Sequence, residues 1–256
     1  MEPIIVELKD IRLIYHEPHA ETLAIDTLNM TIREGEFVAI VGPSGSGKTS
    51  MLNLLCGLIP PSSGSVRLKG KEVSAPGQGI GYMLQRDHLL DWRDIEGNIL
   101  LGLEVKHMLN GETRERALSL LKKYGLEEFQ HHYPRQLSGG MRQKVSLIRT
   151  LAFDPDLLLL DEPFSSLDYQ TRLRASDEIH AIITREHKTA LLVTHDIAEA
   201  ISMADRILVF TERPARVKQE HIITLSAPPS PIARRNAPEF HDYFDLIWKE
   251  LDTYEN

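Results

Sequence analysis

Residues 36–55 read EFVAIVGPSGSGKTSMLNLL and combine three kinds of sequence in succession. The apolar run Phe37–Val41 predicts a buried strand, the glycine-rich segment predicts a loop, and Thr49–Gly57 predicts a helix. Four positions match the phosphate-binding pattern of a glycine, four further residues and then Gly-Lys-Ser/Thr: Gly42, Gly47, Lys48 and Thr49. Glycines let the backbone wrap closely around an anion, and its N–H groups then point inward at the positive end of the helix. The stretch predicts a site for a nucleoside triphosphate.

The polar side chains of this loop have distinct predicted contacts. We expect Lys48 to reach the outer phosphates and the Thr49 hydroxyl to bind Mg²⁺. The nucleotide-binding residues predicted in the loop are Gly42, Pro43, Ser44, Gly45, Ser46, Gly47, Lys48, Thr49 and Ser50.

A second apolar run, Leu157–Leu160, ends at Asp161 and Glu162. Ligands gather at the carboxyl ends of strands in parallel sheets. We therefore expect Asp161 to help hold Mg²⁺ and Glu162 to polarise the attacking water as a general base. The alternative is a buried strand that ends in two solvated acids, and it is weak once a phosphate loop precedes the strand in the same chain.

Composition narrows the class of protein. The chain has 256 residues, of which 42% are hydrophobic and 26% charged, as in ordinary globular proteins. The net charge of −8 argues against nucleic acid as a partner. The chain shows no secretory signal at its start and no apolar run of membrane-spanning length. Cys56 stands alone, so no internal disulfide forms. We expect a cytosolic protein.

The order of the predicted elements divides the chain into parts. Strand and helix signals alternate in residues 1–85 and 154–226, which predicts an α/β core with a mostly parallel sheet. Within it, Val6–Tyr15 and Leu23–Ile32 predict two strands of an N-terminal antiparallel region. Residues 86–153 carry helical signals only, with glycines and prolines between them, and predict an inserted helical subdomain.

Residues 227–256 are predicted to form a linker, Ala227–Pro231, and a C-terminal amphipathic helix. The apolar positions of this helix form one stripe: Phe240, Tyr243, Phe244, Ile247, Trp248 and Leu251. The stripe either covers the parent domain or meets a second subunit. We favour the first interpretation, since a stripe alone does not identify its partner.

A second anion-binding helix start is predicted at residues 137–143, which read LSGGMRQ. Ser138 followed by Gly139 and Gly140 precedes a predicted helix, and a helix N-terminus of this kind can receive a phosphate. A plain helix cap explains Ser138 but does not explain why the chain has a second such site.

Taken in order, these segments resemble the ATP-binding cassette ATPases. Gly42–Thr49 is similar to the Walker A motif of that family, Leu157–Glu162 to its Walker B motif, and Leu137–Gln143 to its signature loop, with Met141 where many members have Gln. Four more matches complete the series: Gln85 resembles the Q-loop glutamine, Ser165–Asp168 the D-loop, His195 the switch histidine, and Tyr15 the aromatic that stacks on adenine.

The resemblance implies a dimer with shared sites. Two cassettes, expected to be identical, face each other head to tail, and each Mg²⁺-bound ATP lies between the phosphate loop of one subunit and Ser138–Gly140 of the other. Gln85 is implied to contact Mg²⁺ or the lytic water, and His195 to hold the γ-phosphate and orient the water with Glu162. Asp168 is implied to touch the opposite subunit. Tyr15 is implied to stack on the base.

A narrower resemblance concerns residues 85–93, which read QRDHLLDWR. This stretch is similar to the Q-loop region of nitrate, sulfonate and taurine importer ATPases, although Asp91 replaces their common proline. Relatives with this pattern also serve thiamine-precursor pyrimidines. Leu89, Leu90 and Trp92 either line a groove for a permease helix or pack within the helical subdomain.

The importer resemblance implies several partners. It places the chain on the inner face of the cell membrane, bound to separate permease subunits and served through them by an extracytoplasmic substrate-binding protein. An exporter ATPase with separate membrane subunits is an alternative. A soluble cassette protein outside transport is a weaker one, because the chain has neither a second cassette nor a coiled-coil insertion.

Overall fold

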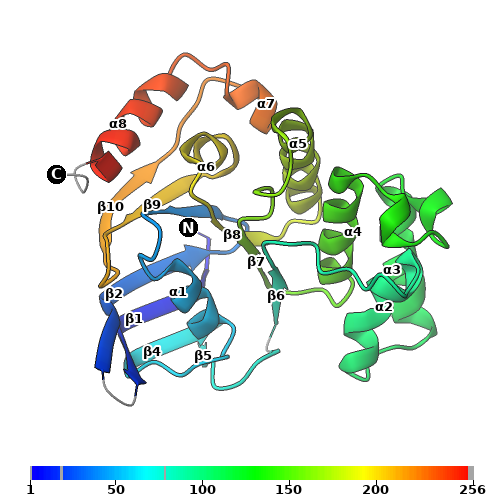
Figure 1. Ribbon diagram of the computed structural model, residues 1–256, viewed down its shortest axis with the longest axis horizontal. Helices are drawn as coiled ribbons and strands as arrows, with labels where there is room; N and C mark the ends of the chain where they lie inside the picture. Colours follow the sequence, from blue (N-terminus) through cyan, green and yellow to red (C-terminus); the bar gives the residue numbers. More distant parts are fainter. Residues whose placement is uncertain (1, 18–19, 78, 253–256) are drawn as a thin grey trace.

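The computed structural model describes residues 2–17, 20–77 and 79–252. A six-stranded sheet crosses the centre of the molecule in the order β10-β9-β3-β8-β7-β6 (Figure 1). Neighbouring strands are parallel except at the β9–β10 pair, which is antiparallel. The strands are β3 (Phe37–Val41), β6 (Ile80–Met83), β7 (Leu157–Asp161), β8 (Thr189–Val193), β9 (Arg206–Phe210) and β10 (Val217–Ile222).

A second sheet is antiparallel and has the order β2-β1-β4-β5. Its strands are β1 (Ile4–Glu17), β2 (Ala20–Arg33), β4 (Ser63–Leu68) and β5 (Lys71–Glu72). The fold class predicted from the sequence is therefore confirmed, with an antiparallel region beside a mostly parallel sheet. Glu17, Pro18 and His19 predict a turn between the first two strands, and Pro18 and His19 lie outside the described residues. β5 and β10 were not predicted, because both are polar and lack the apolar alternation of a half-buried strand.

The central strands are continuously apolar because each faces two cores. In β3, Val38 and Ile40 pack with helix α1 (Lys48–Leu55) and the antiparallel sheet. Phe37, Ala39 and Val41 lie in the core on the other face. That core also contains α4 (Gly139–Leu151), α5 (Tyr169–Arg185) and α6 (Ile197–Met203). Parallel strands that are covered on both faces have continuous apolar sequences, because alternate side chains enter different apolar layers.

Residues 86–153 contain helices and no strand among the part that the structure describes. Besides α4, they form α2 (Ile95–Val105), α3 (Gly111–Lys123) and short 3₁₀ turns at Glu127–Phe129 and Pro134–Gln136. Asp94, Asn110 and Ser138 cap the three helices by accepting a hydrogen bond from a backbone N–H of the first turn. These helices lie together at one side of the molecule, beyond β6 (Figure 1). Their independence as a subdomain stays a prediction.

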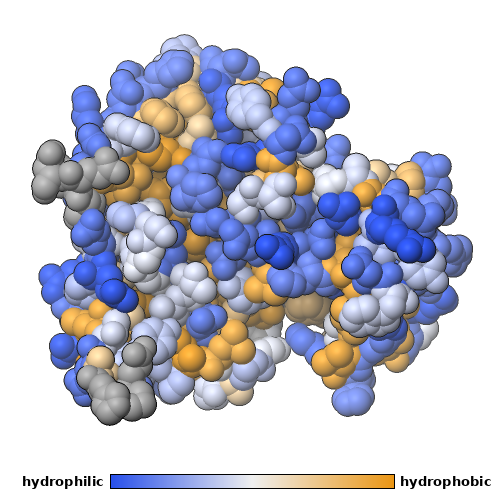
Figure 2. Space-filling model, in the orientation of Figure 1, coloured by the Kyte–Doolittle hydropathy of each residue, from blue (hydrophilic) through white to orange (hydrophobic). Residues whose placement is uncertain are grey.

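The C-terminal segment covers the opposite side of the molecule. α7 (Pro231–Arg234) begins at the last residue of the predicted linker, and α8 (Phe240–Asp252) follows it. Phe240 and Ile247 are buried in the core that includes α6. The apolar stripe of α8 therefore covers its own domain, which is the interpretation that its sequence favours. Figure 2 shows apolar side chains gathered beside α8, and smaller apolar patches elsewhere on the same face. No helix among the described residues is long and apolar enough to cross a membrane.

Candidate functional site

The phosphate loop lies between β3 and α1, at the carboxyl end of the central sheet. Gly47 is the first residue before α1 and has φ of +95°. A Cβ at this position would lie 3.0 Å from the Ala24 carbonyl oxygen and 3.1 Å from the Ala215 Cβ. Only glycine meets both conditions without strain, because it tolerates positive φ and needs no space for a side chain.

Lys48 is buried inside this loop. Its Nζ donates hydrogen bonds to the carbonyl oxygens of Gly42 (2.8 Å) and Pro43 (2.7 Å) and to the Ser46 hydroxyl (3.3 Å). Burial lowers the pKa of Lys48, against the opposing influence of the nearby carboxylates of Glu162 and Asp161. The ammonium makes no ion pair with any described residue and therefore remains available to an anion.

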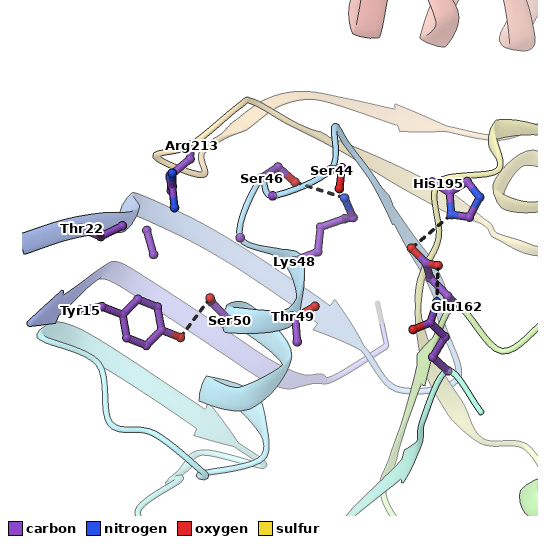
Figure 3. A pocket seen from close by; sticks show the side chains of 14 residues that line it. Tyr15, Thr22, Ser44, Ser46, Lys48, Thr49, Ser50, Glu162, His195 and Arg213 are labelled. Atoms are coloured by element: carbon purple, nitrogen blue, oxygen red, sulfur yellow. Dashed lines mark hydrogen bonds and ion pairs between the residues drawn. The ribbon is translucent and has the colours of Figure 1, made fainter. Parts of the chain in front are cut away.

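A cavity of about 520 Å³ opens over the loop (Figure 3). Its predicted lining residues are Tyr15, Ser44, Gly45, Ser46, Gly47, Lys48, Thr49, Ser50, Gln85, Glu162 and His195, and three unpredicted ones are Thr22, Ala24 and Arg213. Gly42 and Pro43 do not line it, and instead line an adjacent groove with His195 and Trp248. Residues far apart in the sequence therefore meet around a single cavity.

One of the three unpredicted residues follows from strand pairing. Thr22 lies opposite Tyr15 in the antiparallel β1–β2 register, so the register alone would have found it. Arg213 has no such signal, because its place depends on how the turn between β9 and β10 crosses the phosphate loop.

Glu162 is held from two sides at the end of β7. The Gln85 Nε2 donates to its Oε2 at 3.1 Å, and the His195 Nδ1 lies 3.1 Å from its Oε1 (Figure 3). The backbone N–H of Glu162 donates to the Val193 carbonyl oxygen, and its φ is +44°. Non-glycine residues in this strained region cluster at functional sites, where the surroundings hold them in place.

Asp161 lies one residue before, half-buried, and does not line the cavity. The Tyr82 hydroxyl donates to its Oδ2 at 2.9 Å. Burial raises the pKa of Asp161, and the charge of Glu162 adds to this effect. The described residues contain no cluster of three metal-ligating acids, histidines or cysteines. One carboxylate with the Thr49 hydroxyl still fits Mg²⁺, because that ion is commonly held by one or two protein oxygens together with phosphate and water.

Tyr15 lies at the end of the cavity away from Glu162 and His195 (Figure 3). Its hydroxyl donates to the Ser50 hydroxyl at 3.0 Å. This bond ties the ring to the first turn of α1 and leaves the ring beside the cavity, where an aromatic surface can contact a base.

The other predicted set lies elsewhere. Ser138, Gly139, Gly140 and Asp168 line a separate cavity of about 480 Å³, which shares no lining residue with the first. Ser138 caps α4 by accepting from the Met141 N–H, and Asp168 caps α5 by accepting from the Thr171 N–H at 3.0 Å. Hydrogen bonds from Thr171 lower the pKa of Asp168. Both cavities therefore carry helix starts suited to anions.

From the sequence, residues 89–92 are expected either to line a groove for a permease helix or to pack within the helical subdomain, and different residues fit different interpretations. Leu89 is buried in the core that includes α2 and α4, as the packing interpretation predicts. Trp92 is 76% exposed, which excludes packing within the helical segment and leaves its ring free to contact another protein.

Comparison with known proteins supports a single family. The model of the family described as ABC transporter matches residues 25–165. An uncharacterized ABC transporter ATP-binding protein of Bacillus subtilis is 44% identical, with 94% of this chain and 93% of that protein covered. A nitrate import ATP-binding protein of Synechocystis is 36% identical (94% and 93% covered). A taurine import ATP-binding protein of Yersinia pestis is 42% identical (76% of each).

Comparison with a solved structure supports the same family. A dimeric ATP-binding cassette in a post-hydrolysis state, bound to ADP and phosphate, matches with a TM-score of 0.72 and 32% identity over 86% of this chain and 99% of that one. ABC transporter ATP-binding proteins hydrolyse ATP to drive transport. The chain belongs to the ABC transporter family and is an ATPase of importer type.

Proposed function

We propose that this chain hydrolyses ATP at two composite sites between identical subunits and so drives uptake of a small solute through separate permease subunits. The observation that carries the proposal is the separation of the two cavities. One holds the phosphate loop with Glu162, and the other holds Ser138–Gly140. Each is half of a phosphate site, and a second copy placed head to tail completes both halves.

In the first half-site, the loop N–H groups and Lys48 bind the phosphates. Thr49 and Asp161, with Gln85 nearby, are the residues that would hold Mg²⁺, which supplies positive charge to the phosphate oxygens. Glu162 takes the proton from the attacking water. Gln85 and His195, each 3.1 Å from one carboxylate oxygen, keep that carboxylate fixed, so its lone pair stays directed at one point.

The second half-site acts on the nucleotide of the partner. Ser138–Gly140 at the start of α4 offer backbone N–H groups to its γ-phosphate. Asp168, kept ionised by the hydrogen bonds from Thr171, contacts the opposite subunit. ATP then links the subunits, and hydrolysis removes that link.

The relatives support a proposal for the solute and the membrane partners. Two of these relatives are named for nitrate import and taurine import, so we propose a small anion or zwitterion of this kind, or a thiamine-precursor pyrimidine. Permease subunits contact the exposed Trp92, an extracytoplasmic binding protein delivers the solute to them, and the chain lies on the inner membrane face. Uptake of each candidate solute into vesicles that contain the chain with its permease identifies the substrate.

The central test is Glu162→Gln in the full chain. The amide cannot accept the proton, so hydrolysis is expected to fall by about 100- to 10,000-fold, whereas ATP affinity stays within a few-fold. Without hydrolysis the ATP-bound dimer persists, and sedimentation should show a dimer with ATP and a monomer with ADP. Glu34→Gln, at an exposed residue that does not line the cavity, is the control. Near-normal phosphate release, or a monomer in saturating ATP, contradicts the proposal.

A further inference from the structure

Arg213 lines the nucleotide cavity, although no motif predicted it. It lies on the turn between β9 and β10, beyond the parallel strands that carry Gln85, Glu162 and His195. Figure 3 shows Arg213 at the same end of the cavity as Tyr15 and Thr22, away from Glu162 and His195. Its position therefore belongs to the base end of the site and not to the phosphate end.

The turn that carries Arg213 is tied to β2 and to the phosphate loop. The Thr211 hydroxyl donates to the Pro214 carbonyl oxygen at 2.9 Å. The Ala215 N–H donates to the Ala24 carbonyl oxygen at 2.9 Å, and the Asp26 N–H donates to the Ala215 carbonyl oxygen at 3.1 Å. Ala215 is fully buried against Gly47. These bonds fix the place of the turn over the loop before any ligand arrives.

The guanidinium of Arg213 is free. It forms no hydrogen bond or ion pair with the residues that the structure describes, whereas Arg216, three positions on, pairs with Asp26. Lys48 and Arg213 are the cationic side chains of the described cavity lining. Lys48 is bound into the loop at the phosphate end. Arg213 is therefore the charge available at the base end.

We propose that Arg213 binds the adenine base, with its planar guanidinium packed on the face opposite the Tyr15 ring. Arginine stacks on aromatic faces and lysine does so poorly, because the guanidinium is planar and weakly hydrated. The proposal rests on the proposed ATP site and adds a second residue at the base. Since the base is the same in ATP and ADP, the contact increases the affinity for both nucleotides by the same factor.

The test measures Kd of the full chain for ATP and ADP by calorimetry. Arg213→Ala is expected to raise both constants by the same factor, about 2- to 30-fold. Arg213→Lys is expected to recover little of the loss. In a double-mutant cycle, Arg213→Ala should have a smaller effect when Tyr15 is already Ala, since both residues contact one base. Arg185→Ala, an exposed arginine at the end of α5, is the charge-matched control and should bind as wild type.

Three outcomes overturn the proposal: an Arg213→Ala Kd equal to that of wild type, full rescue by lysine with additivity in the cycle, or a loss confined to ATP. The second and third assign Arg213 to a phosphate. Lys48→Ala separates this failure from failure of the ATP site itself. A wild-type Kd in the Lys48→Ala variant contradicts the ATP site. Weakened ATP binding in Lys48→Ala, together with a wild-type Kd in Arg213→Ala, contradicts only the inference about Arg213. Unfolding curves of each variant confirm that the chain is folded.

Discussion

Two glutamates, Glu162 and Glu199, have opposite surroundings. Glu162 lines the cavity, accepts a hydrogen bond from Gln85 on one oxygen and lies 3.1 Å from the His195 Nδ1 on the other. Glu199, on α6, is 3% exposed. The Thr194 hydroxyl donates to its Oε2, and its Oε1 has no hydrogen-bond partner among the described residues. Burial, together with the negative charge of Asp196, raises the pKa of Glu199 to about 8. The chemical behaviour of a glutamate in this protein therefore depends on its environment more than on its residue type.

Glu199 should make the stability of the protein depend on pH. Its folded pKa of about 8 exceeds the ordinary value of 4.5, so the folded state holds the proton more tightly. The resulting stability is fully present below about pH 4.5 and is lost as the pH rises toward 8, by at most about 1.4 kcal/mol per pH unit. Glu199→Gln has no proton to lose. Urea unfolding from pH 5 to 8 should show wild type falling relative to this variant, and parallel curves would contradict the assignment.

At the scale of the element, the phosphate loop depends on two glycines in different ways. Gly45 and Gly47 both have positive φ, of +75° and +95°. A Cβ at Gly45 meets no atom within 4 Å, whereas one at Gly47 meets the Ala24 carbonyl oxygen at 3.0 Å and Ala215 at 3.1 Å. The second position is therefore set by the packing of β2 and of the β9–β10 turn as well as by the loop conformation.

This contrast gives a matched pair of variants. Gly45→Ala should lower the free energy of unfolding by roughly 1–2 kcal/mol, the cost of a left-handed backbone with a Cβ. Gly47→Ala adds a steric clash to the same cost, so the loss should be larger and ATP affinity should fall with it. Urea unfolding and calorimetry measure both. Equal losses in the two variants would show that the contacts of Gly47 do not matter.

At the scale of the whole molecule, the proposed composite site requires two subunits. The phosphate loop and Ser138–Gly140 line separate cavities, on the core and on the helical side of the chain (Figure 1). A pair of inactive variants can test whether subunits complete each other. Ser138→Arg blocks the second half-site, and Lys48→Ala disables the first.

Each variant alone should lose nearly all hydrolysis, because both composite sites of its homodimer are damaged. An equimolar mixture should regain part of the activity, since the mixed dimer retains one intact site. With random pairing, half of the dimers are mixed, so we expect up to about a quarter of the wild-type rate if one site works alone. Phosphate release over a range of mixing ratios measures the recovery. An active Ser138→Arg homodimer would contradict shared sites.

The sequence predicted the central strands and their functional ends well. β3 has the predicted bounds, and β7 extends one residue beyond its predicted end. Covered strands and amphipathic helices leave strong local patterns, since their burial follows the period of the backbone. The sequence missed β5, β10 and α7, which are short or polar. Their pairing and packing depend on residues distant in the sequence, and a local sequence pattern cannot indicate such contacts.

The sequence by itself determined the family, the fold class and the chemical groups of the phosphate loop, because glycine spacing and apolar runs act locally on the backbone. Only the tertiary structure decided which groups share a cavity. It brought Gln85 and His195 onto Glu162, placed Arg213 at the same end of the cavity as Tyr15, and kept Ser138–Gly140 apart in a second cavity. The order of the strands in the sheet and the paths of their connections fix these distances, and neither is written in any single stretch of the chain.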